Sequence, residues 1–234
     1  MQQYAINNPT HKIWMNPMTT PSTLETWLAE EAAVIARLNA GPGPGVARPD
    51  QVAHLTGMEL MQAMLRGELP YAAIAKTLDF TIIEVGEGRA VFQGSPGPAH
   101  LNPMGGIHGG WYATMLDSAL GCAVHTLMPV GRGYTTAELG VNLVKAINPA
   151  KTPRVRAEGK VLHCGRQLAT AEARIVGPDG ALVGIDRTRG PLRADEPPVD
   201  RHPVVRPRDL SDQIVEGLDA EVIGLQLEEK KRPQ

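Results

Sequence analysis

The residues best suited to chemistry lie in one segment, residues 102–117, where a glycine-rich loop leads into an apolar helix. His108, Gly109 and Gly110 stand where that helix is predicted to begin. The first turn of a helix has backbone N–H groups without intrahelical partners and the positive end of the helix dipole. The two glycines let a substrate approach those N–H groups, because no Cβ stands in the way. This predicts a site that stabilises the oxyanion of a carbonyl under attack, with the Asn102 side-chain amide as a second donor.

Asp117 is the only acidic residue of the predicted helix, residues 108–127, and its neighbours are apolar. A carboxylate in such surroundings is costly unless it is paired or functional. Taken alone, it would be read as part of a structural hydrogen-bond network. Beside Asn102 and the glycine pair, its expected role is that of a general base for water or of a nucleophile.

The length of the helix separates Asp117 from the predicted oxyanion site. Eight residues place it roughly 12 Å along the axis from Gly109. Asp117 therefore cannot easily reach a carbonyl held at the start of its own helix. Two antiparallel helices in a dimer would bring each Asp117 to the other subunit's Gly109. We therefore predict a homodimer or homotetramer with a site shared between chains.

A threonine after the helix is a further candidate. Residues 134–147 alternate between apolar and polar, with Ala137, Leu139 and Val141 on the face toward the helix. Counting back by two places Thr135, rather than Thr136, on that face. Its hydroxyl would hold the attacking water.

The rest of the chain must position these residues. Two runs rich in β-forming residues, 80–85 and 89–93, flank a glycine-bearing turn and predict a hairpin. After the long helix, strands are expected at residues 134–147, 155–163, 168–176 and 181–188. A short connection between the middle two places Glu158 opposite Arg174 and Lys160 opposite Glu172. The predicted fold class is α+β, with one antiparallel sheet wrapped around one long helix.

Segments at both ends extend this predicted domain, residues 57–190. Residues 1–56 form an N-terminal extension with a mobile start, a helix over about 23–39 capped by Ser22 or Thr23, and a Gly/Pro linker at 41–45. A second short helix is expected over 57–66. Residues 191–234 form a tail, partly disordered or helical, with a possible amphipathic helix over 211–230.

Composition excludes several classes of function. The formal net charge is −2 and aromatic residues make up 4%, which argues against nucleic acid or an anionic membrane as a partner. No apolar run is long enough to span a bilayer. Cys122 and Cys164 have no C-x-x-C spacing, which favours free thiols and a cytoplasmic location. His100, His108 and Asp117 lack the spacing of a metal site, so no metal and no cofactor is expected.

Three motifs together resemble the PaaI-type (phenylacetic acid degradation) acyl-CoA thioesterase family, whose members have the hot-dog fold. The first is Asn-x-x-Gly-x-x-His-Gly-Gly from Asn102, with Asp117 seven residues beyond the second glycine of the pair. The others are residues 134–139 and residues 159–166. The resemblance covers residues 57–184. It is weaker at residues 184–190, which are charged where the family's last strand is apolar.

The resemblance implies a role for each matching position. Gly109 and Asn102 would polarise the thioester carbonyl, Asp117 would act across the dimer, and Thr135 would position water. His108, Gly110, Gly165 and Arg166 would contact substrate, with Arg166 near a coenzyme A phosphate. The expected activity is hydrolysis of an acyl- or aryl-CoA thioester. The alternatives are a hot-dog hydratase or dehydratase and a non-catalytic acyl-CoA-binding module.

Overall fold

The computed structural model describes residues 22–187 and 225–229. Its helices are α1 (Thr23–Ala40), α2 (Pro49–Val52), α3 (Gly57–Leu65), α4 (Ala73–Thr77) and α5 (Gly109–His125), with a 3₁₀ turn at Pro98–His100. Its strands are β1 (Phe80–Gly86), β2 (Arg89–Gly94), β3 (Arg132–Thr136), β4 (Val141–Leu143), β5 (Val155–Cys164), β6 (Leu168–Val176), β7 (Leu182–Arg187) and β8 (Leu225–Glu229).

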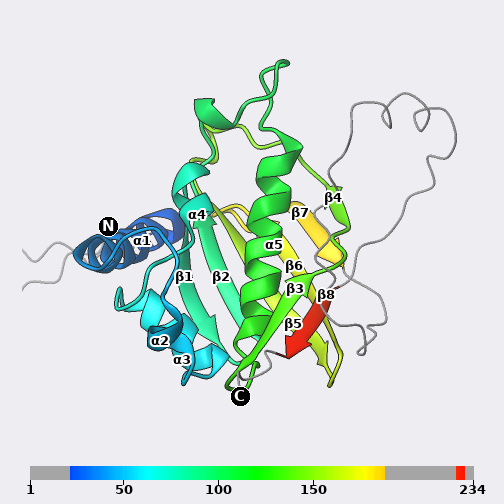
Figure 1. The fold of residues 1–234 in the computed structure, drawn as a ribbon. Helices are drawn as coiled ribbons and strands as arrows, with labels where there is room; N and C mark the ends of the chain where they lie inside the picture. The colour runs from blue at the N-terminus through cyan, green and yellow to red at the C-terminus, as the bar shows by residue number, and fades with distance from the viewer. Residues whose placement is uncertain (1–21, 188–224, 230–234) are drawn as a thin grey trace, which may run out of the picture.

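All the described strands belong to one antiparallel sheet. The main path runs β1-β2-β5-β6-β7-β4, and β8 pairs with both β3 and β6. Helix α5 lies across one face of this sheet, and α1 to α4 lie on the side of β1 (Figure 1). The predicted α+β architecture, one long helix wrapped by one antiparallel sheet with extra N-terminal helices, is confirmed.

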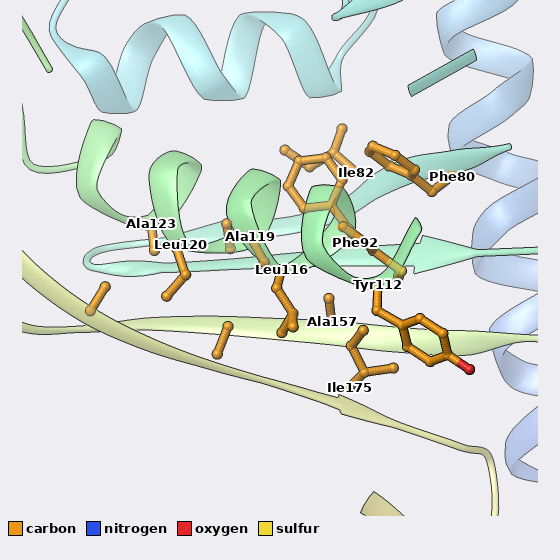
Figure 2. Close-up of a cluster of buried hydrophobic side chains, with 14 of the residues drawn as sticks. Phe80, Ile82, Phe92, Tyr112, Leu116, Ala119, Leu120, Ala123, Ala157 and Ile175 are labelled. Atoms are coloured by element: carbon orange, nitrogen blue, oxygen red, sulfur yellow. The ribbon is translucent and has the colours of Figure 1, made fainter. Parts of the chain in front are cut away.

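Small residues let α5 pack very closely against the sheet. Ala119 and Ala123 on the helix and Ala157 on β5 are fully buried. Larger side chains of α5, such as Leu116 and Leu120, lie among the residues of the strands (Figure 2). The closest approach is at Gly159 of β5, where a Cβ would lie 2.2 Å from the Ala119 carbonyl oxygen. Only glycine fits there, because that oxygen belongs to the helix backbone.

Helix α1 covers part of the opposite face of the sheet. Its start has a capping box in which Ser22 and Glu25 exchange hydrogen bonds with each other's backbone N–H. Gln93 of β2 is fully buried on that face; its side-chain NH₂ donates to the Trp27 carbonyl at 3.2 Å. The Arg156 guanidinium lies 4.5 Å from the centroid of the Trp27 ring and donates to Gln93 Oε1 at 2.8 Å. These contacts fix the predicted N-terminal helix on the sheet.

The pairing of β5 with β6 agrees with the predicted register. Glu158 stands opposite Arg174 and Lys160 opposite Glu172. The first pair forms a salt bridge at 2.9 Å. Residues 165–167 join the two strands, as the sequence indicated.

Two elements differ from their predictions. The single strand expected over 134–147 is two strands, β3 and β4, separated by residues 137–140. A helix was also expected over residues 211–230. Of these, the structure describes only residues 225–229, which form strand β8. Alternation at Leu225, Gln226 and Leu227 is the signal for a strand that the longer helical pattern concealed. Helices α2 and α4 were not predicted, and the mobile start expected before α1 lies outside the described residues.

Within the part of the chain that the structure describes, no helix combines the length and the apolar character needed to cross a membrane.

We predict that Gly159→Ala destabilises the fold, because its Cβ would overlap the backbone of α5. The expected loss in the free energy of unfolding is about 1–3 kcal/mol, the usual cost of overpacking a core. Gly86→Ala is the matched control, since nothing lies within 4 Å of its Cβ position. Urea denaturation measures both variants. Equal stability of the two would contradict the close approach of α5 to β5.

Candidate active site

The loop before α5 is held as a tight turn around Asn102. The backbone N–H of Asn102 donates to the Gly106 carbonyl at 2.7 Å, and Gly105 has a φ of 81°. The Asn102 side-chain oxygen accepts from the backbone N–H groups of Met104, at 2.9 Å, and Gly106, at 3.1 Å. Both bonds use the oxygen. Among the described residues, the side-chain NH₂ of Asn102 donates to none, so it remains a free donor.

His108 caps the start of α5. Its Nδ1 accepts from the backbone N–H of Gly110 at 2.9 Å. This bond occupies one of the two N–H groups that the sequence assigned to the oxyanion site. The N–H of Gly109 has no acceptor among the described residues, so Gly109 and not Gly110 offers the backbone donor. His108 itself is exposed and acts here as an N-cap.

The apolar side chain of Leu143 lies beside Gly109, whose backbone N–H has no acceptor among the described residues. The nearest side-chain atom to a Cβ built on Gly109 is Leu143 Cδ1 of β4, at 3.4 Å. Leu143 is 52% exposed in the single chain. A carbonyl placed at Gly109 would therefore have Leu143 as a wall on one side.

His100, by contrast, is a structural residue. It is buried, its Nδ1 accepts from the Gly97 N–H at 3.1 Å, and its ring lies 5.6 Å from that of Trp111. Its carbonyl accepts from the His108 N–H at 2.7 Å, which ties the two ends of the loop together.

Asp117 lies two turns along α5 and is half-buried. The Thr136 hydroxyl donates to its Oδ1 at 2.8 Å. A carboxylate that accepts such a bond has a fixed orientation, and its second oxygen has no hydrogen-bond partner among the described residues. Asp117 is therefore an oriented carboxylate with one oxygen that has no partner among the described residues.

The expectation that Thr135 points toward α5 is wrong. Thr135 is exposed, whereas its neighbours Tyr134 and Thr136 contact the helix. The alternation was counted back from residues 137–143, but the chain leaves the strand after Thr136. Because the count by two was carried through that break, it assigned every residue before the break to the wrong face of the strand. The hydroxyl at the site belongs to Thr136.

Two groups near Asp117 are poor bases or nucleophiles. Burial raises the pKa of the Cys122 thiol to about 12, and the Asp117 carboxylate adds to this shift. Burial also raises the pKa of the Tyr134 phenol well above its usual value. Its ring fits against Gly121, where a Cβ would lie 2.4 Å from the Tyr134 oxygen. Both groups stay neutral and leave Asp117 as the local candidate for base or nucleophile.

The β5–β6 connection presents a basic edge at the other end of α5. Arg166 is exposed, and its carbonyl accepts a hydrogen bond from the Arg132 guanidinium. The Nε of Arg132 is buried and has no partner among the described residues. Sequence reasoning found Gly165 and Arg166 but missed Arg132. Arg132 is the first residue of β3, the strand that also carries Thr136, and this closeness in the sequence was the available signal.

Glu138 was also missed. It is 4% exposed, one of its carboxylate oxygens has no partner among the described residues, and burial raises its pKa. It lies in the break between β3 and β4, where an alternating pattern predicted an outward residue.

A single chain does not bring all the predicted site residues together. Asn102 lies in the loop before α5 and Gly109 in its first turn, whereas Asp117 meets Thr136 further along the helix. Eight residues of helix separate the two groups by roughly 12 Å. Gly165 and Arg166 belong to a third region. Within residues 22–187 and 225–229, no group of three His, Cys, Asp or Glu side chains is arranged to hold a metal ion.

We predict that the two thiols differ strongly in reactivity, because the thiolate is the nucleophilic form. With a pKa of about 12, Cys122 is almost entirely protonated at pH 8, whereas Cys164 is exposed. Brief iodoacetamide treatment of the folded protein should modify Cys164 and leave Cys122 unmodified until urea is added. Peptide mass spectrometry measures both, and rapid labelling of Cys122 in the folded protein would contradict its raised pKa.

Comparisons with known proteins bear on the same region. Residues 104–183 match the family model of the Thioesterase superfamily. No curated protein matches the chain significantly in sequence.

Several solved structures are similar to part of the chain. A putative thioesterase, phenylacetic acid degradation-related, from Ralstonia eutropha JMP134 is 27% identical, with a TM-score of 0.49, over 53% of this chain and 93% of that one. The PaaI protein of E. coli is 22% identical, with a TM-score of 0.48, over 56% and 89%. A PaaI mutant from Thermus thermophilus is 23% identical, with a TM-score of 0.43, over 48% and 92%.

The matched residues hold all of α5 and the strands β3, β4, β5 and β6, and they carry Gly109, Asp117 and Thr136. The fold around them is that of the hot-dog proteins, one antiparallel sheet wrapped around one long helix. The resemblance read from the sequence is thus confirmed to this extent: residues 104–183 match the family model of the Thioesterase superfamily.

Proposed function

We propose that the protein hydrolyses acyl-CoA thioesters. The observation that carries the proposal is the hydrogen bond from Thr136 to Asp117. It turns the one acidic residue of a buried helix into an oriented carboxylate with a free oxygen. The free donors of Asn102 and Gly109 at the start of the same helix suit the thioester carbonyl.

We further propose that the site forms between two copies of the chain. The outer edges of β3 and β4 carry no strand among the described residues. Leu143 and Val144, more than half exposed, lie along that edge. A second copy placed there with its α5 antiparallel would bring its Asp117 to the Gly109 of the first. Each pair of copies would then have two complete sites.

Hydrolysis follows from this arrangement in either of two ways. As a general base, Asp117 takes a proton from water, whose oxygen attacks the thioester carbonyl carbon. The C–S bond then breaks, and the coenzyme A sulfur leaves and takes up the proton. As a nucleophile, Asp117 itself attacks the carbon, the C–S bond breaks, and coenzyme A leaves as a thiolate that takes a proton from solvent. Water then hydrolyses the resulting anhydride and releases the acid and the Asp117 carboxylate. In both, Asn102 and Gly109 stabilise the negative charge on the carbonyl oxygen.

The basic edge formed by Arg132 and Arg166 is proposed as the contact for coenzyme A phosphates. Arginine suits phosphate because its planar guanidinium donates two parallel hydrogen bonds. Gly165 has its N–H bonded to the Leu168 carbonyl at 2.7 Å, so it shapes the turn that presents Arg166.

We predict that Asp117→Asn lowers kcat by about 10²–10⁴, the usual contribution of a general base, while acyl-CoA binding persists. The assay follows release of the coenzyme A thiol from a panel of short, medium, long and aryl acyl-CoAs. Calorimetry with a non-hydrolysable thioether analogue measures binding. Wild-type protein that binds the analogue but releases no thiol would instead indicate a binding module. Water addition to an enoyl-CoA would indicate a hydratase.

The shared site predicts complementation between two inactive variants. Asn102→Asp keeps the oxygen that holds the turn and replaces only the free NH₂, so the loop should stay folded. The Asn102→Asp and Asp117→Asn proteins are mixed, dissociated and allowed to reassociate. Half of the resulting dimers then combine one chain of each variant, and each of these dimers has one intact site. The mixture should recover about a quarter of wild-type activity, since a random 1:2:1 distribution of dimers is expected. No recovery, with mixed dimers demonstrated, would contradict a shared site.

We predict that Thr136→Val lowers kcat about 10–100-fold, because a hydrogen bond to a charged group contributes about 1.5–3 kcal/mol. Thr135→Val is the matched control, with the same substitution one residue away on the exposed face. It should retain nearly full activity. Steady-state kinetics of both variants decides which threonine serves Asp117.

A further inference from the structure

Strands β7 and β8 lie in one line along β6. The first pairs with one half of β6, from Leu182 opposite Val176 to Arg187 opposite Glu172. The second pairs with the other half, with Leu225 opposite Ala169 and Gln226 opposite Leu168. Both are antiparallel to β6, so they run in the same direction. Strand β8 therefore begins close to where β7 ends.

On their side away from β6, strands β7 and β8 have two different partners, β4 and β3. Strand β4 pairs with β7, and Val141 stands opposite Asp186. Strand β3 pairs with β8, with Arg132 opposite Glu229 and Thr136 opposite Leu225. Among the described strands, β3 has no other partner. Its connection to the rest of the sheet runs through β8 (Figure 1).

Building on the proposed function, we infer that β7 and β8 are two halves of one sheet strand, interrupted by residues 188–224, and that β8 positions Thr136. Residues 225–229 of the tail are thus a part of the active-site scaffold. Thr136 holds Asp117, β8 holds the strand that carries Thr136, and residues 225–229 thereby set the orientation of the carboxylate.

The sheet geometry explains why β3 needs this strand. Neighbouring strands lie about 4.8 Å apart, so β3 stands roughly 10 Å from β6 with β8 between them. Without β8, the backbone N–H and C=O groups on that side of β3 would lose their partners, which is unfavourable in a half-buried strand. Neither β6 nor β7 could replace β8 without moving β3, and with it Thr136, away from Asp117.

The residues of β8 suit this place. Leu225 and Leu227 occupy the register positions opposite Thr136 and Tyr134, the two residues of β3 that contact α5. Glu229 occupies the register position opposite Arg132. The sequence of β8 thus has leucines at the register positions opposite the two residues of β3 that contact α5.

The first test is hydrogen–deuterium exchange of the full-length protein, which needs no substrate. Amides of residues 225–229 and 133–136 should be protected at least tenfold over the rates of unfolded peptides. Gln226→Pro should remove protection from both segments, because proline cannot donate to the ladder in the middle of a sheet. Lys231→Pro, just beyond β8, is the control and should leave both protected. Exchange of wild-type residues 225–229 at unfolded rates would overturn the inference.

The second test is kinetic and separates positioning from general stability. Gln226→Pro should lower kcat about tenfold or more, with KM changed less than about threefold. In a Thr136→Val background it should have little further effect on kcat, because both changes act through the same hydrogen bond. Equal fold-losses in both backgrounds would mean that β8 acts elsewhere, and the inference would fail.

These outcomes stay separate from those of the proposed function. If the wild-type protein hydrolyses no thioester, exchange still decides whether β8 pairs with β3 and orders residues 133–136. If Asp117→Asn abolishes hydrolysis while residues 225–229 exchange freely, the proposed function stands and the role of β8 is excluded.

Discussion

The packing of α5 into the curve of the sheet is the constraint on which the other features depend. The helix approaches β5 so closely that position 159 has room for no side chain. The apolar side chains of α5 fill the space against the sheet, and its polar groups lie on the remaining, partly exposed side. Among the described residues, the backbone N–H of Gly109 in the first turn has no acceptor. Further along, Asp117 accepts a hydrogen bond from the Thr136 hydroxyl of β3.

The separation along α5 is the reason for the proposal of a site shared between two chains. The Gly109 N–H and the Asp117 carboxylate keep a fixed distance because they belong to one helix, so no loop movement can bring them together within one chain. Two copies with antiparallel helices would bring them together. The helix itself would then position both groups, and only Asn102 would depend on the loop that precedes the helix.

The sequence was sufficient where its patterns were local. The hairpin β1–β2, the long helix, the register of Glu158 with Arg174 and the loop from Asn102 to His108 were predictable, because each depends on nearby residues. The face of Thr136 was not predictable, because it depends on where the chain leaves β3. The role of the Gly110 N–H was also hidden, since a histidine cap was not considered. The pairing of β8 was least predictable, because no local pattern states which distant strand a tail will join.

The helix that precedes the domain has a consequence for larger assemblies. Sheets that stack face to face lie about 10 Å apart, and α1 fills that layer above β2 and β5 through Trp27, Gln93 and Arg156. Copies of the chain therefore cannot stack back to back over these strands. Any face-to-face stacking of copies would have to use other surfaces, so α1 limits the ways in which copies of the chain could assemble.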